Sequence, residues 1–262
     1  YDGLKFTTYR TEDGLPSNFI LDILIDNNGV WIATQKGLVK MKDEKIIWME
    51  PSELAAKDTA FRSAVESNLI AGAVMGATDE SGDARIFATK LATEFENRGG
   101  EIRTNCRVTD FISHNGYVQG VTTEHGDLLA DRVVLSSGVA SRALAKKIGI
   151  TIPILPIKGY SVTVPITDER NVPIASCTDL KHRLVISRLG SRLRVAGFAE
   201  IGSDDACDAG RAAAARDRLE ELFPEAADYH LFENWTGFRP MTPDGAPIIG
   251  EAETLKNLWF NT

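Results

Sequence analysis

Arg239 is the residue whose type and setting point most directly to chemistry. It lies in the Gly- and Pro-containing run Trp235–Gly250, WTGFRPMTPDGAPIIG. A guanidinium is planar and always charged, and its fork of N–H groups suits a bidentate, charge-assisted contact with a carboxylate. The alternative is an arginine that is solvated on a surface loop. We take Arg239 as the first candidate for a ligand-binding residue.

Three small residues, Ser136, Ser137 and Gly138, follow directly after the run Asp131–Leu135. A continuous apolar run is typical of a strand buried on both faces of a mostly parallel sheet, and ligands bind at the ends of such strands. A simple strand-to-helix turn with a serine cap is an equal alternative. Tyr160 could also present its hydroxyl to a ligand, although core packing is favoured for it.

Composition argues against several other kinds of site. The four histidines lie far apart in polar or turn-like contexts, which predicts no metal or catalytic role for them. The three cysteines, Cys106, Cys177 and Cys207, contain no CxxC pair, so neither a zinc site nor a disulfide framework is indicated. The net charge of −8, with acidic and basic residues alternating, argues against a nucleic-acid surface.

Apolar residues are spread along the whole chain. No run approaches the roughly 20 apolar residues of a membrane-spanning helix, and no signal peptide is evident. The dispersed cysteines favour a reducing compartment. We therefore expect a cytoplasmic protein, and the sequence leaves peripheral attachment to the inner membrane open.

The first 48 residues have the pattern of short antiparallel strands. The predicted strands are Phe19–Ile25 and Val30–Thr34, with turn residues between them and a closing Lys36–Leu38. The order GLPSN, DNNG, VWIAT, KGL resembles one blade of the propeller repeats found in the sensor regions of two-component regulators. One blade cannot close a propeller. A natural fusion, an engineered junction and an error of sequence assembly all remain open as its origin.

The rest of the chain predicts α/β structure over residues 49–150 and α+β structure over residues 151–262. An amphipathic helix is expected over Ala84–Asn97, then a strand at Glu101–Thr104 and a three-stranded meander over Arg107–Ala130 with an Asn-Gly turn. The last part predicts a largely antiparallel sheet. Its expected strands are Ile152–Val164, Arg183–Arg188, Arg192–Glu200 and Tyr229–Arg239, with one helix at Ala212–Leu222.

Seven motifs in one order resemble the D-amino acid oxidase superfamily of flavin-dependent oxidoreductases, and within it the D-amino acid dehydrogenases. The resemblance covers about residues 49–262, and the Trp235–Gly250 run is its most specific part. The other carriers are Gly82–Ala84, Arg107–Val108, Val133–Gly138, Pro156–Ser161, Gly197–Glu200 and Asn257–Thr262.

The resemblance implies a partial FAD-binding, Rossmann-like domain at 49–150 and an antiparallel-sheet substrate domain at 151–262. It implies that Arg239 pairs with the carboxylate of an amino acid substrate, with Tyr160 as a second substrate contact. It places Val108 beside the adenine of FAD and Ser136, Ser137 and Gly138 beside its phosphates and ribose. The implied reaction is oxidation of a D-amino acid to a 2-oxo acid and ammonia, with a quinone as the expected electron acceptor.

The chain also departs from the family pattern. The GxGxxG turn that holds the flavin pyrophosphate is absent, and Ala71–Gly76 does not replace it. We therefore expect a chain truncated at both ends, which binds FAD weakly or not at all. Three alternatives stay open: a glycine or sarcosine oxidase, a sensor or binding module, and a hybrid chain without function.

Overall fold

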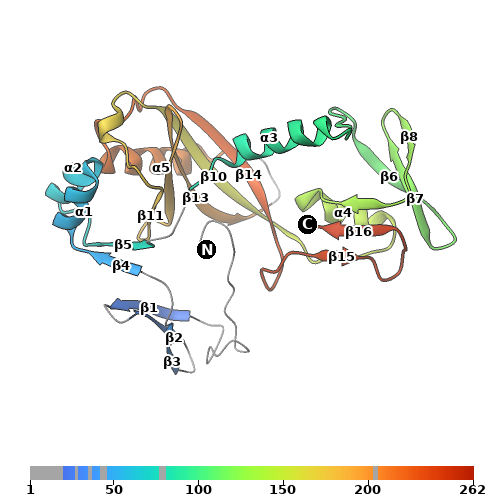
Figure 1. Cartoon of the computed structure of the whole chain (residues 1–262), viewed down its shortest axis with the longest axis horizontal. Coiled ribbons are helices and arrows are strands. Elements are labelled where there is room, and N and C mark those ends of the chain that lie inside the picture. Colours follow the sequence, from blue (N-terminus) through green and yellow to red (C-terminus); the bar gives the residue numbers. More distant parts are fainter. Residues whose placement is uncertain (1–19, 27–28, 35–36, 42–45, 77–80, 203–205) are drawn as a thin grey trace. The chain divides into compact units, whose positions relative to one another are not determined.

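The computed structural model of the chain describes residues 20–26, 29–34, 37–41, 46–76, 81–202 and 206–262 (Figure 1). Two compact units make up the chain. Unit 1 comprises residues 1–87, 161–196 and 209–234, and unit 2 comprises residues 88–160, 197–208 and 235–262. The predicted domain boundaries at 48 and 150 stay a prediction.

The strands predicted for the first segment are present. β1 (Ile20–Asp26), β2 (Gly29–Thr34) and β3 (Gly37–Met41) form one antiparallel sheet in that order. Ile25 pairs with Val30 and Thr34 with Gly37, as expected for hairpins with short turns. The turn residues 27–28 and the GLPSN run lie outside the described residues, and the propeller blade stays a prediction.

Unit 1 continues with a small helical cluster and the helix of the last segment. β4 (Ile46–Met49) pairs antiparallel with β5 (Ala73–Gly76), and α1 (Pro51–Lys57), η2 (Thr59–Phe61) and α2 (Arg62–Glu66) lie between them in sequence. Glu50 and Glu53 form a capping box at the start of α1, where Pro51 is the first helical residue. α5 (Ala209–Leu222) buries Ala212, Ala215, Leu219 and Leu222 on one face.

A five-stranded sheet contains the long strands predicted for the last part of the chain. Its order is β11 (Cys177–Asp179), β12 (Leu184–Leu189), β13 (Arg192–Ile201), β10 (Leu155–Pro165) and β14 (Glu233–Met241). The residues of β10 from Ile157 to Val162 are all buried. η4 (Glu169–Asn171) follows β10 in sequence.

Unit 2 contains the predicted meander. β6 (Val108–His114), β7 (Tyr117–Thr123) and β8 (Gly126–Leu129) form an antiparallel sheet in sequence order (Figure 1). Asn115 and Gly116 both have positive φ angles, as the type I′ hairpin turn requires. The meander prediction is confirmed.

A second sheet of unit 2 joins segments far apart in sequence. β9 (Val133–Leu135) pairs parallel with β16 (Leu258–Asn261), which pairs antiparallel with β15 (Ile249–Glu251). η3 (Gly138–Ala140) and α4 (Ser141–Lys147) follow β9. Leu135, Leu258 and Phe260 belong to a hydrophobic core that extends to the meander and to the segment after α4. The chain thereby holds the end of β9 beside its last residues.

Two predictions for residues 84–104 have different outcomes. α3 spans Ala84–Asn97, as predicted, and its large apolar side chains are exposed. The strand predicted at Glu101–Thr104 is wrong, because these residues are irregular. A strand needs a hydrogen-bonded neighbour, and among the described residues none pairs with this segment.

Candidate substrate and cofactor site

Arg239 lies near the end of β14, and its guanidinium rests on the neighbouring strand β10. A Cβ placed on Gly159 would lie 2.7 Å from Nη2, 2.8 Å from Cζ and 2.8 Å from Nη1 of Arg239. These near-equal distances show that the plane of the guanidinium faces the Gly159 backbone. Arg239 Nη1 donates a hydrogen bond to the Phe198 carbonyl oxygen at 2.9 Å. In the described part of the chain, the Arg239 side chain makes no other hydrogen bond.

Tyr160 and Lys158 flank Gly159 on β10, and their side chains leave the strand on its opposite face. The Tyr160 hydroxyl donates to Glu200 Oε2 at 2.7 Å, and Lys158 Nζ lies 3.3 Å from Glu200 Oε1. Lys158 Nζ also donates to the Ala206 carbonyl at 3.2 Å. Tyr160 and Lys158 are each 2% exposed. The cluster is a buried polar network on the side of β10 away from the Arg239 guanidinium.

The environment of Tyr160 favours its neutral form. Burial raises the pKa of the phenol, and the hydrogen bond to the Glu200 carboxylate raises it further, because that carboxylate is an acceptor. The Tyr160 hydroxyl is therefore a committed donor to Glu200. This geometry matches the core-packing alternative that the sequence favoured for Tyr160.

The residues Ser136–Gly138 form the predicted turn at the end of β9. Gly138 has a φ of 56°, and its carbonyl accepts a hydrogen bond from Thr262 Oγ1 at 3.2 Å. The Ser137 amide donates to Ser141 Oγ at 3.0 Å, so Ser141 supplies the side-chain oxygen at the start of α4. The side chains of Ser136 and Ser137 remain exposed.

The Arg239 motif reaches this turn. A Cβ on Gly138 would lie 3.9 Å from Pro240 Cγ, and Pro240 directly follows Arg239. The structure thus brings together the Arg239 motif, the Ser136–Gly138 turn and Thr262. Val108 has no hydrogen bond to this group among those of the described residues. It is half-buried on β6 and pairs with Thr123 on β7.

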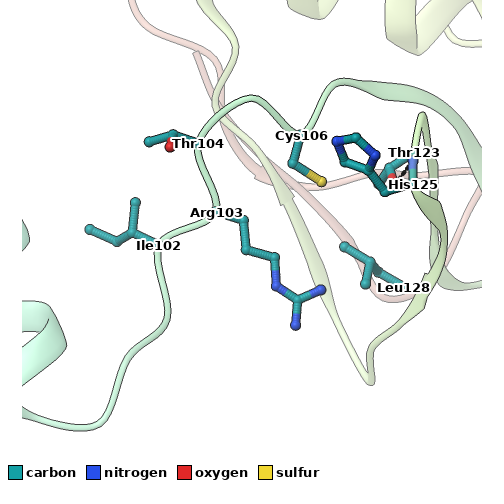
Figure 2. Close-up of a pocket in the computed structure, with 7 residues that line it drawn as sticks. All are labelled: Ile102, Arg103, Thr104, Cys106, Thr123, His125 and Leu128. Carbon is teal, nitrogen blue, oxygen red and sulfur yellow. Dashed lines mark hydrogen bonds between the residues drawn. The ribbon is translucent and has the colours of Figure 1, made fainter.

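A pocket of about 360 Å³ lies between the irregular segment after α3 and the meander (Figure 2). Figure 2 shows the Arg103, Cys106 and His125 side chains around it, and Ile102, Thr104, Thr123 and Leu128 complete its lining. Arg103 is paired with Glu101 at 2.6 Å, and His125 Nε2 contacts the Asn105 carbonyl at 2.9 Å. Arg103 and His125, the two residues of the lining that can carry a positive charge, are thus bonded to neighbouring protein groups.

The remaining titratable residues offer no metal centre. Among the residues that the structure describes, no three His, Cys, Asp or Glu side chains gather as metal ligands would. Over the same residues, no helix is long and apolar enough to cross a membrane. Burial, together with the carboxylates of Asp58 and Asp179, raises the pKa of the Cys177 thiol to about 12, which leaves it unreactive at neutral pH.

The Ser136–Gly138 turn fits one part of a flavin dinucleotide site. It stands at the carboxyl end of a parallel strand, where such ligands bind, and it exposes two hydroxyl groups. Its left-handed glycine bends the chain sharply without a side chain on the ligand side. Ser136, Ser137 and Gly138 could therefore hold the phosphate or ribose groups of FAD.

A family comparison agrees with this geometry. Residues 22–262 match the family model described as FAD dependent oxidoreductase, and the chain belongs to this family. The match begins inside the segment for which a propeller blade was predicted.

Among curated proteins the chain is similar to D-amino acid dehydrogenases. It is 41% identical over 213 residues to the enzyme of Paramagnetospirillum magneticum, covering 81% of this chain and 50% of that one. It is 40% identical over 200 residues to the enzyme of Vibrio vulnificus, covering 76% of this chain and 48% of that one. The chain spans about half the length of these relatives.

Solved structures share the fold. Glycine oxidase from Geobacillus kaustophilus superposes with a TM-score of 0.71 at 23% identity, over 83% of this chain and 57% of that one. L-proline dehydrogenase from P. horikoshii gives a TM-score of 0.70 at 18% identity, over 82% and 58%. The predicted fold class, mixed α/β with an antiparallel sheet, is confirmed.

Sequence reasoning did not single out the residues that hold Arg239 and fill the space behind it. Phe198, Glu200 and Lys158 appeared there only as members of motifs. One signal was available, because a lysine within a run of apolar strand residues needs a partner acid when it is buried. Nothing in the sequence indicated that Glu200 was that acid.

Proposed function

We propose that this chain carries the substrate-binding part of an FAD-dependent enzyme that oxidises D-amino acids to 2-oxo acids and ammonia. The observation that carries the proposal is Arg239. Its guanidinium lies flat on a glycine backbone, is tied by one N–H to a carbonyl, and keeps its other N–H groups for a ligand. The similarity to D-amino acid dehydrogenases over about four fifths of the chain supports the choice of substrate.

In this proposal Arg239 binds the substrate carboxylate through two parallel N–H groups, which fixes the orientation of the α-carbon. Bound FAD would supply the chemistry, by accepting a hydride from that carbon. Ser136, Ser137 and Gly138 would hold phosphate or ribose groups of the cofactor, and Val108 would contact its adenine. No protein acid or base is needed when the substrate amine is already neutral. In this proposal the residues of this chain therefore bind and orient the substrate and the cofactor.

Tyr160 has a supporting part in this proposal. Its buried hydroxyl donates to Glu200, so it contributes to the network behind the Arg239 site and reaches a substrate only if that hydrogen bond breaks. A quinone as electron acceptor and a cytoplasmic location, with peripheral attachment to the inner membrane, complete the proposal.

A glycine or sarcosine oxidase is the second candidate. The fold similarity to glycine oxidase supports it, and the same arginine would serve a glycine carboxylate. Substrate comparison separates the two, since a D-amino acid dehydrogenase turns over D-alanine in preference to glycine and passes electrons to a quinone analogue in preference to oxygen.

The test replaces Arg239 in the flavin-loaded enzyme that contains this segment. Arg239→Ala removes a charge-assisted bidentate contact worth about 2 to 5 kcal/mol when desolvated, which lowers kcat/KM roughly 30- to 4,000-fold. Arg239→Lys keeps the charge without the two parallel N–H groups, so its kcat/KM should lie between those of the wild type and Arg239→Ala. Arg98→Ala is a matched control, because Arg98 is exposed directly after α3 and pairs there with Glu94. Unchanged kcat/KM for D-alanine in Arg239→Ala rules out the carboxylate role.

A further inference from the structure

The Arg239 guanidinium lies close against the backbone of Gly159. Three of its atoms would lie within 2.8 Å of a Cβ at Gly159, a separation that real Cβ atoms do not show. Any residue other than glycine at this place must push the guanidinium away from the strand. Because a guanidinium is the flexible end of a long side chain, it can move without unfolding the sheet. The identity of residue 159 therefore controls where the Arg239 guanidinium lies.

Phe198 supplies the second constraint through its backbone. Its φ is 62°, in the left-handed region that bulky residues seldom occupy. The Phe198 carbonyl accepts the hydrogen bond from Arg239 Nη1. A phenylalanine that kept ordinary strand geometry would have a different carbonyl direction at this place. A strained backbone beside a binding residue is a frequent feature of functional sites.

The ring of Phe198 is anchored on the far side of β10. It packs edge-to-face on Tyr160, with ring centroids 5.8 Å apart and an interplanar angle of 84°. Tyr160 is itself fixed by its hydrogen bond to Glu200, and Glu200 is paired with Lys158. The polar network therefore holds the ring, whereas the left-handed backbone sets the direction of the carbonyl.

We infer that Gly159 and Phe198 are positioning residues for Arg239. Gly159 has no side chain, so the plane of the guanidinium can lie directly against the backbone. The hydrogen bond to the Phe198 carbonyl fixes the rotation of the guanidinium. The remaining N–H groups are then oriented for a bidentate contact with a carboxylate. This inference rests on the proposed function for its biological meaning. The geometry of the positioning is testable without any substrate.

The first experiment measures the arginine side chain itself. Phenylglyoxal modifies guanidinium groups, and peptide mass mapping gives the rate at Arg239 in the 262-residue chain, relative to Arg98 in the same sample. In Gly159→Ala we expect the rate at Arg239 to rise about tenfold, as for the loss of a hydrogen bond to a charged group. Gly82→Ala is the matched control, because a Cβ at Gly82 meets no atom within 4 Å.

A pair of variants at Phe198 separates the backbone from the ring. Phe198→Gly removes the ring but adopts the left-handed conformation freely, so the carbonyl contact and the Arg239 rate should stay within about twofold of wild type. Phe198→Val also removes the ring, but a β-branched residue resists a positive φ, so the Arg239 rate should rise about tenfold. A purely structural role for the ring would affect both variants equally.

An unchanged Arg239 rate in Gly159→Ala overturns the inference, and so does an equal response of the two Phe198 variants. If Phe198→Val does not fold, Gly159→Ala decides alone. In the flavin-loaded enzyme, Gly159→Ala should raise KM for D-alanine about tenfold and leave kcat within about twofold, as for a lost binding contact. If the Arg239 rate rises while KM is unchanged, the positioning role stands and the carboxylate role of Arg239 fails.

Discussion

Asp58 connects two distant segments of unit 1 through one side chain. Its carboxylate caps η2, where Oδ1 accepts a hydrogen bond from the Ala60 amide at 3.1 Å. Its Oδ2 accepts a hydrogen bond from the Ile174 amide at 2.8 Å, across 116 residues of sequence. Asp58 is 9% exposed. Replacing it with alanine removes both acceptors at once.

The two contacts give the size of the expected loss. Loss of an N-cap acceptor costs about 0.5 to 2 kcal/mol. Leaving a partly buried amide such as that of Ile174 without a partner costs about 1 to 3 kcal/mol. We therefore expect Asp58→Ala to lower the free energy of unfolding by about 2 to 4 kcal/mol, which lowers Tm by roughly 5 to 15 °C for a chain of this size.

Thermal unfolding followed by circular dichroism measures this loss. Asp58→Asn is the informative partner, because its single amide oxygen keeps one of the two contacts, so its loss should be about half that of Asp58→Ala. Asp127→Ala is the matched control, since Asp127 is exposed on β8 and such substitutions stay within about 0.5 kcal/mol. If Asp58→Ala is as stable as Asp127→Ala, the two hydrogen bonds do not hold unit 1 together.

Three further predictions concern single residues. Burial and two nearby carboxylates raise the pKa of Cys177 to about 12, so iodoacetamide at pH 8 should alkylate it far more slowly than the exposed Cys207. Although burial alone would raise the pKa of Asp179, hydrogen bonds from Arg218 and a neighbouring histidine hold it below the ordinary value. The native state therefore binds fewer protons than the unfolded state near pH 4, and this stabilisation is lost as the pH falls through the native pKa. Asp179→Asn should be less stable at pH 7 by about 1.5 to 3 kcal/mol and should lose less on acidification. Gly120→Ala should cost about 1 to 3 kcal/mol, because φ is 156° and the new Cβ would lie 2.1 Å from a backbone oxygen of β8.

For each of these three predictions, one experimental result would contradict the reasoning. Equal alkylation rates of Cys177 and Cys207 by peptide mapping would mean that the Cys177 thiol is neither buried nor near negative charge. Parallel acid-unfolding curves for wild type and Asp179→Asn would exclude an ion pair there. A Gly120→Ala chain with the denaturation midpoint of Gly82→Ala would show that β7 and β8 separate easily at that point.

Local chemistry explains why parts of the fold are predictable from the sequence. A type I′ turn requires two positive φ angles in succession, which few residues other than Asn and Gly tolerate. The hairpin turn lies at Asn115–Gly116, where both φ angles are positive. The apolar spacing over Ala84–Asn97 matches 3.6 residues per turn, and α3 has these bounds. In both cases the signal lies within 14 residues or fewer and requires no distant partner.

The pairing of strands that lie far apart in the sequence is much harder to predict from local patterns. Glu101–Thr104 has the composition of a strand but no described neighbour to pair with, so it is irregular. β9 has only three residues, and its parallel partner β16 lies more than 120 residues later. The sequence gives the propensity of such segments, whereas the partner is decided by tertiary packing.

The same difference between local and distant signals applies to the candidate site. The motif alone makes Arg239 a candidate, because residue type and context are both local. The features that direct it are not local: a glycine on a different strand, and a carbonyl turned by a left-handed phenylalanine that no propensity favours. A phenylalanine in a strand normally indicates packing, and here its ring does pack, on Tyr160. Its carbonyl points to Arg239 because of the left-handed backbone, so one residue serves the core through its ring and the candidate site through its carbonyl. Sequence patterns assign one role to each side chain and therefore miss a residue whose contribution to the site comes from its backbone.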